Sequence, residues 1–212
     1  MQFVANHTSS PIPKVYCAFE RKGCKYILME RVQGQILRDG WWKRSPEYKA
    51  KILAQIKEMV EQMRRIPPPP GQGISNVAGG PLFDSRISGG SFHGPFNTLQ
   101  DFHRHLREGY EGEREHEHDA NRLVEWHKQY CTKPVFTHGD LSTLNILVRG
   151  DEVVGIVDWE TAGWWPEYWE YTSTWHVNPH NEFWRDEVDR FLEPKVEELE
   201  MEKVRRKYFG VF

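Results

Sequence analysis

The sequence predicts an α+β fold in which a few short strands are combined with several helices. Three observations support this prediction. Apolar residues recur at helical spacing between residues 45 and 63 and again from residue 98, whereas residues 135–157 contain short β-rich pieces separated by turns. At 212 residues the chain is long enough to bury a core of its own. We therefore expect one domain, or one large lobe with a small appendage.

The charge and the cysteine content limit the classes of partner. Lys and Arg total 28 against 31 for Asp and Glu, a net charge of -3, so no basic surface is expected for nucleic acid or an acidic membrane. The odd number of cysteines, 3, has no metal-ligand spacing and favours a reducing compartment. With neither a signal peptide nor a long apolar segment, a cytoplasmic protein with a small-molecule partner is predicted. The oligomeric state is not indicated.

The N-terminal part is predicted to be a hairpin. Its strands are Pro11–Phe19 and Lys25–Gly34, and Glu20–Cys24 connects them. Two strands alone are marginally stable in water, so this hairpin needs something to pack against.

The first long helix is predicted from Ser45, an N-cap residue followed by Pro46 and Glu47. Its apolar positions at helical spacing are Ile52, Leu53, Ile56, Met59, Val60 and Met63. The helix should end at the prolines of residues 67–70. The Gly-rich and Ser-rich stretch that follows predicts a long, mostly irregular connection over residues 67–95.

Further helices are predicted downstream. Thr98 with Asp101 has the pattern of a helix start, and a charged break at Glu111–Asp119 precedes a second helix that runs through Leu123 to Tyr130. The tail from Asn181 is charged and predicted to be helical.

The residues that carry the chemistry are His138-Gly139-Asp140, then Asn145, then Asp158 thirteen residues later. If Arg149–Glu152 is a tight turn between two strands, Asn145 begins the first strand and Asp158 lies at the end of the second. The side chains of Asp140, Asn145 and Asp158 can then converge. One carboxylate would accept a proton, and the other, with the amide oxygen, would hold a hard cation such as Mg²⁺.

Three runs of sequence carry a family resemblance. They are Phe136-Thr-His-Gly-Asp-Leu-Ser-Thr-Leu-Asn-Ile-Leu-Val, Gly155-Ile-Val-Asp-Trp-Glu-Thr-Ala-Gly163 and Pro166-Glu-Tyr-Trp-Glu170. They resemble aminoglycoside phosphotransferases and choline kinases of the protein kinase-like superfamily. Upstream, Tyr26-Ile-Leu-Met-Glu-Arg-Val-Gln-Gly34 is similar to the same family's approach to the hinge between lobes.

This resemblance implies a protein kinase-like fold, mainly the helical C-terminal lobe with a catalytic β-hairpin. Residues 1–34 would be a remnant of the N-lobe, with the hinge at 29–34, and Met1–Asn6 would be the end of the helix that positions the strand lysine. Residues 35–212 would be the C-lobe, with the catalytic loop at 136–148 and the metal motif at 155–163.

The resemblance also implies an ATP- and Mg²⁺-dependent phosphotransferase that acts on a hydroxyl of a small molecule. Asp140 would be the catalytic base, Asn145 and Asp158 would hold Mg²⁺ against ATP, and His138 would support the catalytic loop. The backbone groups that would meet the adenine belong to Met29, Glu30, Arg31 and Val32.

The sequence departs from the family pattern in its N-lobe. The phosphate-covering loop and the strand lysine are expected before the hinge, yet Lys14, Lys22 and Lys25 all fall in or beside the hairpin. A non-catalytic pseudokinase or binding module is therefore the alternative, and a metal-dependent phosphohydrolase is a third. The acceptor is not indicated by any pattern.

Two groups of residues have ordinary explanations. The histidines between residues 93 and 118 lack zinc-ligand spacing, and His116-Glu-His118 is more typical of a solvated face. Trp164, Trp165 and Trp169 could line a pocket, but packing within the lobe is the simpler interpretation.

Overall fold

The computed structural model describes residues 1–112, 117–176 and 179–210. The chain forms two compact units, which we describe separately. Unit 1 comprises Met1–Ile66, Asp140–Trp159 and Thr174–Glu193, and unit 2 comprises Pro67–Gly139, Glu160–Ser173 and Pro194–Phe212. The division at residue 34 into an N-lobe remnant and a C-lobe is a different one and stays a prediction.

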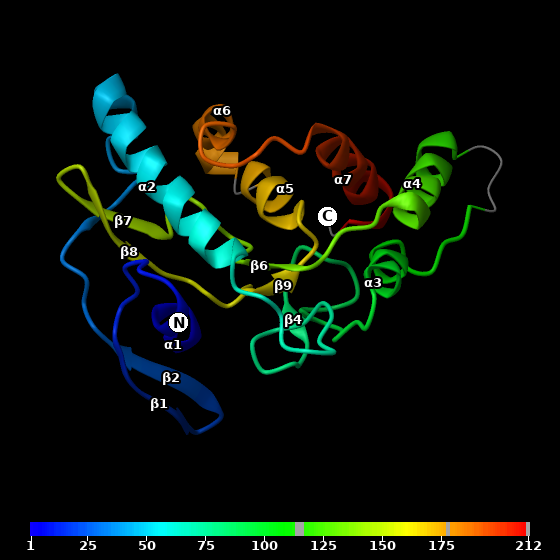
Figure 1. The fold of residues 1–212 in the computed structure, drawn as a ribbon, viewed down its shortest axis with the longest axis horizontal. Coiled ribbons are helices and arrows are strands. Elements are labelled where there is room, and N and C mark those ends of the chain that lie inside the picture. The colour runs from blue at the N-terminus through cyan, green and yellow to red at the C-terminus, as the bar shows by residue number, and fades with distance from the viewer. Residues whose placement is uncertain (113–116, 177–178, 211–212) are drawn as a thin grey trace. The chain divides into compact units, whose positions relative to one another are not determined.

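Unit 1 is built on a three-stranded antiparallel sheet. The strands β3 (Gln35–Ile36), β7 (Ile146–Arg149) and β8 (Glu152–Ile156) lie in the order β3-β7-β8. The predicted tight turn is present, with Arg149 paired to Glu152 and Gly150 at φ 59°. Helix α2 (Pro46–Arg64) packs along β8 (Figure 1).

The predicted start of α2 is confirmed. The Ser45 hydroxyl accepts a hydrogen bond from the Tyr48 amide at 3.2 Å, and Pro46 occupies the first turn. Its buried face consists of Ile52, Leu53, Ile56, Val60 and Met63. The helix ends at Arg64 because Pro67 disfavours helical backbone in the residue before it.

The N-terminal hairpin of unit 1 consists of β1 (Val15–Arg21) and β2 (Cys24–Met29), and α1 (Gln2–His7) precedes it. Lys22 and Gly23 both have positive φ, which suits a two-residue turn between twisted strands. Apart from the half-buried Val15, every residue of the two strands is exposed.

The remaining helical pieces of unit 1 are η1 (Trp41–Lys43), η2 (Pro179–Trp184) and α6 (Arg185–Val188). Trp41 meets Trp184 edge to face at 5.7 Å, and its indole donates a hydrogen bond to Glu187 at 3.1 Å. These contacts bury two large aromatic rings against one another.

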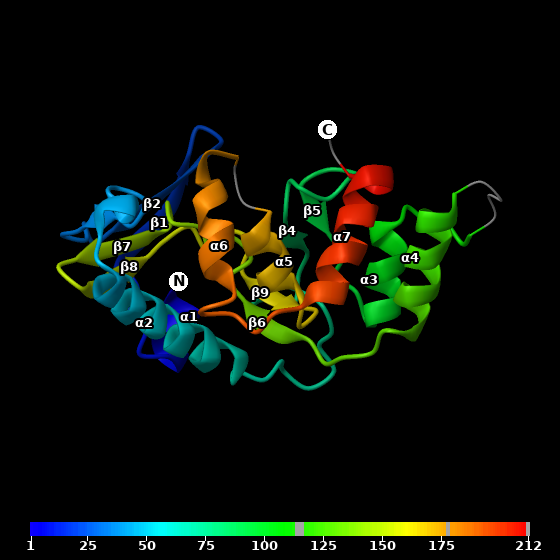
Figure 2. The same ribbon diagram turned by 90° about the horizontal axis from the view of Figure 1, so that it is seen from above.

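Unit 2 contains α3 (Leu99–Leu106), α4 (His118–Gln129) and α7 (Val196–Phe209). Helix α4 contacts both of the others, and the three lie side by side in Figure 2. Strand β6 (Val135–Thr137) pairs antiparallel with β9 (Gly163–Trp165), and β4 (Leu82–Phe83) pairs with β5 (Phe92–His93). Helix α5 (Trp169–Trp175) begins in unit 2 and ends in unit 1.

The core of unit 2 is rich in aromatic rings. Its buried members are Ile74, Leu82, Ile87, Phe102, Leu106, Trp165, Tyr168 and Trp169. The rings of Trp165 and Trp169 stack in parallel at 4.7 Å, and Trp164 is 1% exposed. These tryptophans therefore serve as core, as their simpler interpretation predicted.

Several boundaries differ from the prediction. Helix α4 begins at His118, inside the predicted charged break, and the C-terminal region is interrupted at residues 189–195 between α6 and α7. The connection at 67–95 contains the short pair β4 and β5 besides irregular backbone. Neither β9 nor α5 was predicted, because the aromatic run that forms them has no clear period. No described helix is long and apolar enough to cross a membrane.

A buried pair of histidines joins α3 to α4. The imidazoles of His103 and His127 stack at 4.0 Å. His103 donates from Nδ1 to the carbonyl of His127 at 3.1 Å, since a carbonyl only accepts, and Nε2 lies 3.0 Å from the Tyr168 hydroxyl. Burial lowers the pKa of His103 from 6.5 to about 4 and holds the pKa of His127 well below its usual value.

We expect the free energy of unfolding to fall as the pH drops from 6.5 to 4. The unfolded chain binds a proton on His103 near pH 6.5, whereas the folded chain resists it until about pH 4, so acid favours unfolding. His103 alone contributes about 3 kcal/mol of this loss. Urea unfolding between pH 7.5 and 4.5 measures it, and His103→Asn should flatten the pH dependence. An equal slope in this variant and in an exposed control, His7→Asn, would contradict the expectation.

Candidate functional site

The β7–β8 hairpin brings Asn145 and Asp158 to one end of the sheet in unit 1. Ile146 pairs with Ile156, and the pairing extends one step further because the Val157 amide donates to the Asn145 carbonyl at 2.9 Å. Asn145 therefore enters β7 at the same end at which Asp158 leaves β8. The predicted convergence of these two positions rests on this register.

Asp140 contacts Asn145 directly. The Asn145 amide nitrogen Nδ2 donates to the Asp140 carboxylate oxygen Oδ2 and to the Asp140 main-chain carbonyl, both at 2.9 Å. The intervening loop is tightly turned, since the Ser142 amide donates to the Asp140 carbonyl at 2.8 Å and the Asn145 amide to the Ser142 carbonyl at 3.1 Å. The two polar side chains are thus held together by the loop that separates them.

This arrangement fixes which atom of Asn145 is left for a cation. The amide nitrogen Nδ2 makes both contacts with Asp140, so Oδ1 is the atom that does not bond to it. An amide oxygen beside a carboxylate-bearing strand end suits Mg²⁺, which prefers oxygen ligands and completes its shell with water and phosphate. No cluster of three or more His, Cys, Asp or Glu with metal-ligand geometry occurs in the part of the chain that the structure describes.

Asp158 has an unusual backbone conformation, with φ at 62°. A left-handed conformation at a non-glycine residue costs about 1–2 kcal/mol. Such strain is kept where the surroundings enforce it, and it concentrates at functional positions. The next residue, Trp159, is 9% exposed and donates its indole N–H to the Ile156 carbonyl at 2.9 Å, which turns the chain sharply as it leaves β8.

The four predicted hinge residues leave β2 and run onto the same sheet. Met29 ends the strand. The Glu30 amide donates a hydrogen bond to the Lys14 carbonyl at 2.8 Å, so this N–H already has a partner within the hairpin. Arg31 is exposed, and Val32 packs against Gly155 of β8, where an added Cβ would lie 3.2 Å from Val32. The segment then enters β3, which pairs with β7.

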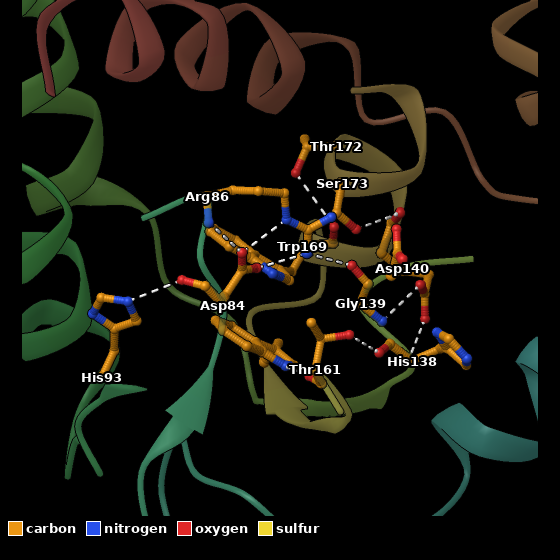
Figure 3. Close-up of polar contacts among 12 residues, drawn as sticks. Asp84, Arg86, His93, His138, Gly139, Asp140, Thr161, Trp169, Thr172 and Ser173 are labelled. Carbon is orange, nitrogen blue, oxygen red and sulfur yellow. Dashed lines mark hydrogen bonds and ion pairs between the residues drawn. The ribbon is translucent and has the colours of Figure 1, made fainter. Parts of the chain in front are cut away.

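In unit 2, the backbone that precedes Asp140 is held by three side chains (Figure 3). The Glu170 carboxylate accepts the amides of His138 at 2.7 Å and of Gly139 at 3.0 Å. The Thr161 hydroxyl donates to the His138 carbonyl at 2.7 Å, and the Arg86 guanidinium donates to the Gly139 carbonyl at 2.6 Å. Each backbone donor and acceptor of the two residues therefore has a side-chain partner.

The backbone conformation of Gly139 requires glycine. Its φ is 82°, and an added Cβ would lie 2.9 Å from the Thr161 hydroxyl. His138 is fully buried, and its supporting role in the catalytic loop stays a prediction.

Glu170, Thr161, Asp84 and Arg86 hold the loop but were not among the predicted site residues. A signal for Glu170 was available, because a carboxylate in the middle of the run Tyr168-Trp169-Glu170-Tyr171 is expected to be buried with partners. Asp84 and Arg86 gave no signal, since they lie in the segment that was predicted to be irregular.

We expect Glu170→Gln to destabilise the fold by about 2 kcal/mol, or roughly 4–8 °C in Tm. The substitution replaces a charged acceptor of two amides by a neutral group whose NH₂ would face one of these donors. Glu167→Gln is the matched control, because Glu167 is paired with Lys195 at a partly exposed position. Thermal melts of both variants test the prediction, and equal shifts would contradict it.

A pair of substitutions at Asp158 separates its backbone from its carboxylate. Both Asp158→Gly and Asp158→Ala remove the carboxylate, but only glycine adopts a φ of 62° without strain. We expect the glycine variant to be more stable than the alanine variant by about 1 kcal/mol in urea unfolding. Equal stability would mean that the left-handed backbone is not retained in solution.

The model of the phosphotransferase enzyme family, APH, matches residues 1–207. No curated protein sequence matches the chain at a significant level. Solved structures do match, with identities low enough that the likeness concerns the fold.

Three of these structures are aminoglycoside phosphotransferases. A thermostable mutant of APH(4)-Ia in a ternary complex with ADP and hygromycin B is 17% identical, with a TM-score of 0.63 over 96% of this chain and 70% of that chain. ADP-bound APH(2'')-Ib is 14% identical, with a TM-score of 0.59 over 96% and 67%. The streptomycin-ATP-APH(2'')-IIa complex is 13% identical, with a TM-score of 0.57 over 98% and 68%. The predicted kinase-like fold is confirmed.

Proposed function

Since this chain belongs to the phosphotransferase enzyme family, we propose that it transfers the γ-phosphoryl group of ATP to a hydroxyl of a small molecule, with Mg²⁺ as cofactor. One observation carries the proposal. Asp140 and Asn145 are joined by two hydrogen bonds of 2.9 Å at the end of the hairpin from which Asp158 emerges. The family template uses a base, an amide ligand and a second acid in these positions.

In this proposal Asp140 acts on the acceptor. Its carboxylate orients the hydroxyl and takes its proton while the hydroxyl oxygen forms a bond to the γ-phosphorus. The bond between the γ-phosphorus and the β–γ bridging oxygen breaks, and ADP leaves. The Asn145 amide, by donating to Oδ2 of Asp140, restricts the rotation of the carboxylate, so the base is held in place before the acceptor binds.

Asn145 and Asp158 would hold Mg²⁺ through an amide oxygen and a carboxylate oxygen. When bound, Mg²⁺ would neutralise charge on the phosphate oxygens. The Asp158 backbone, fixed at φ 62° and followed by the anchored indole of Trp159, keeps the carboxylate at the end of the sheet. The backbone of Arg31 and Val32 and the carbonyl of Glu30 would meet the adenine, since the Glu30 amide already has a partner.

Support for nucleotide and small-molecule substrates comes from the structures with the same fold. They include complexes with ADP and hygromycin B and with ATP and streptomycin. For this chain we propose ATP and a polyhydroxylated small molecule. A substrate screen identifies the acceptor, because a shared fold does not determine it.

The nucleotide half of the proposal is tested by thermal shift with ATP, with and without Mg²⁺. We expect the wild type and Asp140→Asn to be stabilised by ATP with Mg²⁺, and Asp158→Asn to lose this stabilisation because it weakens cation binding. Asp151→Asn, at the turn end of the same hairpin and paired with exposed Lys51, is the matched control. A wild type without any Mg²⁺-dependent shift would contradict the proposal.

The catalytic half is tested by γ-phosphoryl transfer from labelled ATP to a panel of hydroxyl compounds that includes aminoglycosides. Asp140→Asn should lower turnover by about 10²- to 10⁴-fold, the range expected when a general base is removed. Unchanged turnover would exclude this role for Asp140. Nucleotide binding without transfer to any acceptor would instead favour the non-catalytic binding module.

A further inference from the structure

The carbonyl of Gly139 is held by an ion pair from a distant part of unit 2. Nη2 of Arg86 donates to this carbonyl at 2.6 Å and to Oδ2 of Asp84 at 2.6 Å, while Nε of Arg86 donates to Oδ1 of Asp84 at 2.7 Å (Figure 3). The guanidinium thus forms a bidentate ion pair with the carboxylate and donates a further N–H to the loop. We call Asp84 and Arg86 together the carbonyl clamp.

We propose that the carbonyl clamp is a positioning device for Asp140, an inference that rests on the proposed function. The Gly139 carbonyl belongs to the peptide bond that joins Gly139 to Asp140, and a peptide bond is planar. Fixing its oxygen therefore fixes the direction of the Asp140 amide and limits how the Asp140 backbone can turn. The clamp acts on the base through the backbone.

The clamp is also held together by contacts of its own. Asp84 is completely buried, and its Oδ1 also accepts the Arg86 main-chain amide at 2.9 Å, so one carboxylate fixes both ends of the arginine. The Asp84 carbonyl accepts from Nε2 of His93 at 3.0 Å, and His93 in turn lies 2.9 Å from Nε2 of His105 on α3. Because the Asp84 carbonyl only accepts, Nε2 of His93 carries a hydrogen and Nδ1 can accept from His105.

The clamp holds a different backbone group from those that Glu170 and Thr161 hold. Glu170 and Thr161 hold the His138 amide, the His138 carbonyl and the Gly139 amide. Only the Gly139 carbonyl, the group next to Asp140, is held by Arg86. Gly139 has a φ of 82° and lacks a side chain that would restrict its rotation. Loss of the clamp would therefore remove a side-chain contact from the peptide that joins Gly139 to Asp140.

The first test is hydrogen–deuterium exchange of the whole chain, which requires no acceptor. In Arg86→Gln we expect amides in residues 140–145 to exchange about tenfold faster, the effect of losing a charge-assisted hydrogen bond. Peptides from α2 and α7 should be unchanged. Arg104→Gln is the matched control, since Arg104 is a 67% exposed cation of the same unit. Unchanged exchange at 140–145 in a folded Arg86→Gln protein would overturn the proposal.

Asp84→Asn is the second variant, because it keeps the shape of the Asp84 side chain and removes the negative charge that holds Arg86. It should raise exchange at 140–145 in the same direction as Arg86→Gln. Faster exchange throughout unit 2 in both variants would show a general structural role and overturn the positioning role.

The second test is kinetic and uses the acceptor found for the wild type. Arg86→Gln should lower kcat about tenfold or more while the KM for ATP changes less than about twofold, since misplacing a catalytic group affects the chemical step. A raised KM with an unchanged kcat would contradict the inference. If the wild type transfers phosphate to no acceptor, the proposed function fails, and the exchange experiment still decides whether the clamp orders the loop.

Discussion

The antiparallel pairing of β7 with β8 is the constraint on which the candidate site depends. The two strands are joined by a two-residue turn, so the residues before β7 and after β8 must come out at the same end. The hydrogen bond from the Val157 amide to the Asn145 carbonyl extends the register to the edge of the site. A slip of one residue would turn Asn145 away from Asp140. The burial of Val153 and Ile156 on β8, a strand that packs along α2, opposes such a slip.

The loop before Asn145 depends on polar side chains in a largely apolar interior. Glu170 is 1% exposed, yet it has two amides as partners, which offsets the cost of burying a carboxylate. Asp84 is buried with Arg86 in the same way. Burial without partners would destabilise the fold by several kcal/mol. These groups therefore hold the loop backbone through contacts that also satisfy their own charges.

Local structure was predictable from the sequence where one residue type determines it. Ser45 and Thr98 cap their helices as predicted, and Thr98 forms a reciprocal pair of hydrogen bonds with Asp101. The aromatic run after residue 163 was not predictable, because its rings pack on all sides and show neither helical nor strand periodicity. Glu170 belongs to that run, so its role as a double acceptor was missed along with α5.

The sequence by itself determined the family, the hairpin and the spacing of Asp140, Asn145 and Asp158, because caps, turns and short spacings depend on neighbouring residues. Only the tertiary structure decided which side chains hold the loop, since Arg86 and Glu170 lie 53 and 31 residues from Gly139. It also decided the left-handed backbone of Asp158 and the burial of His103. Contacts between distant segments depend on how the whole chain packs, and no local pattern encodes that packing.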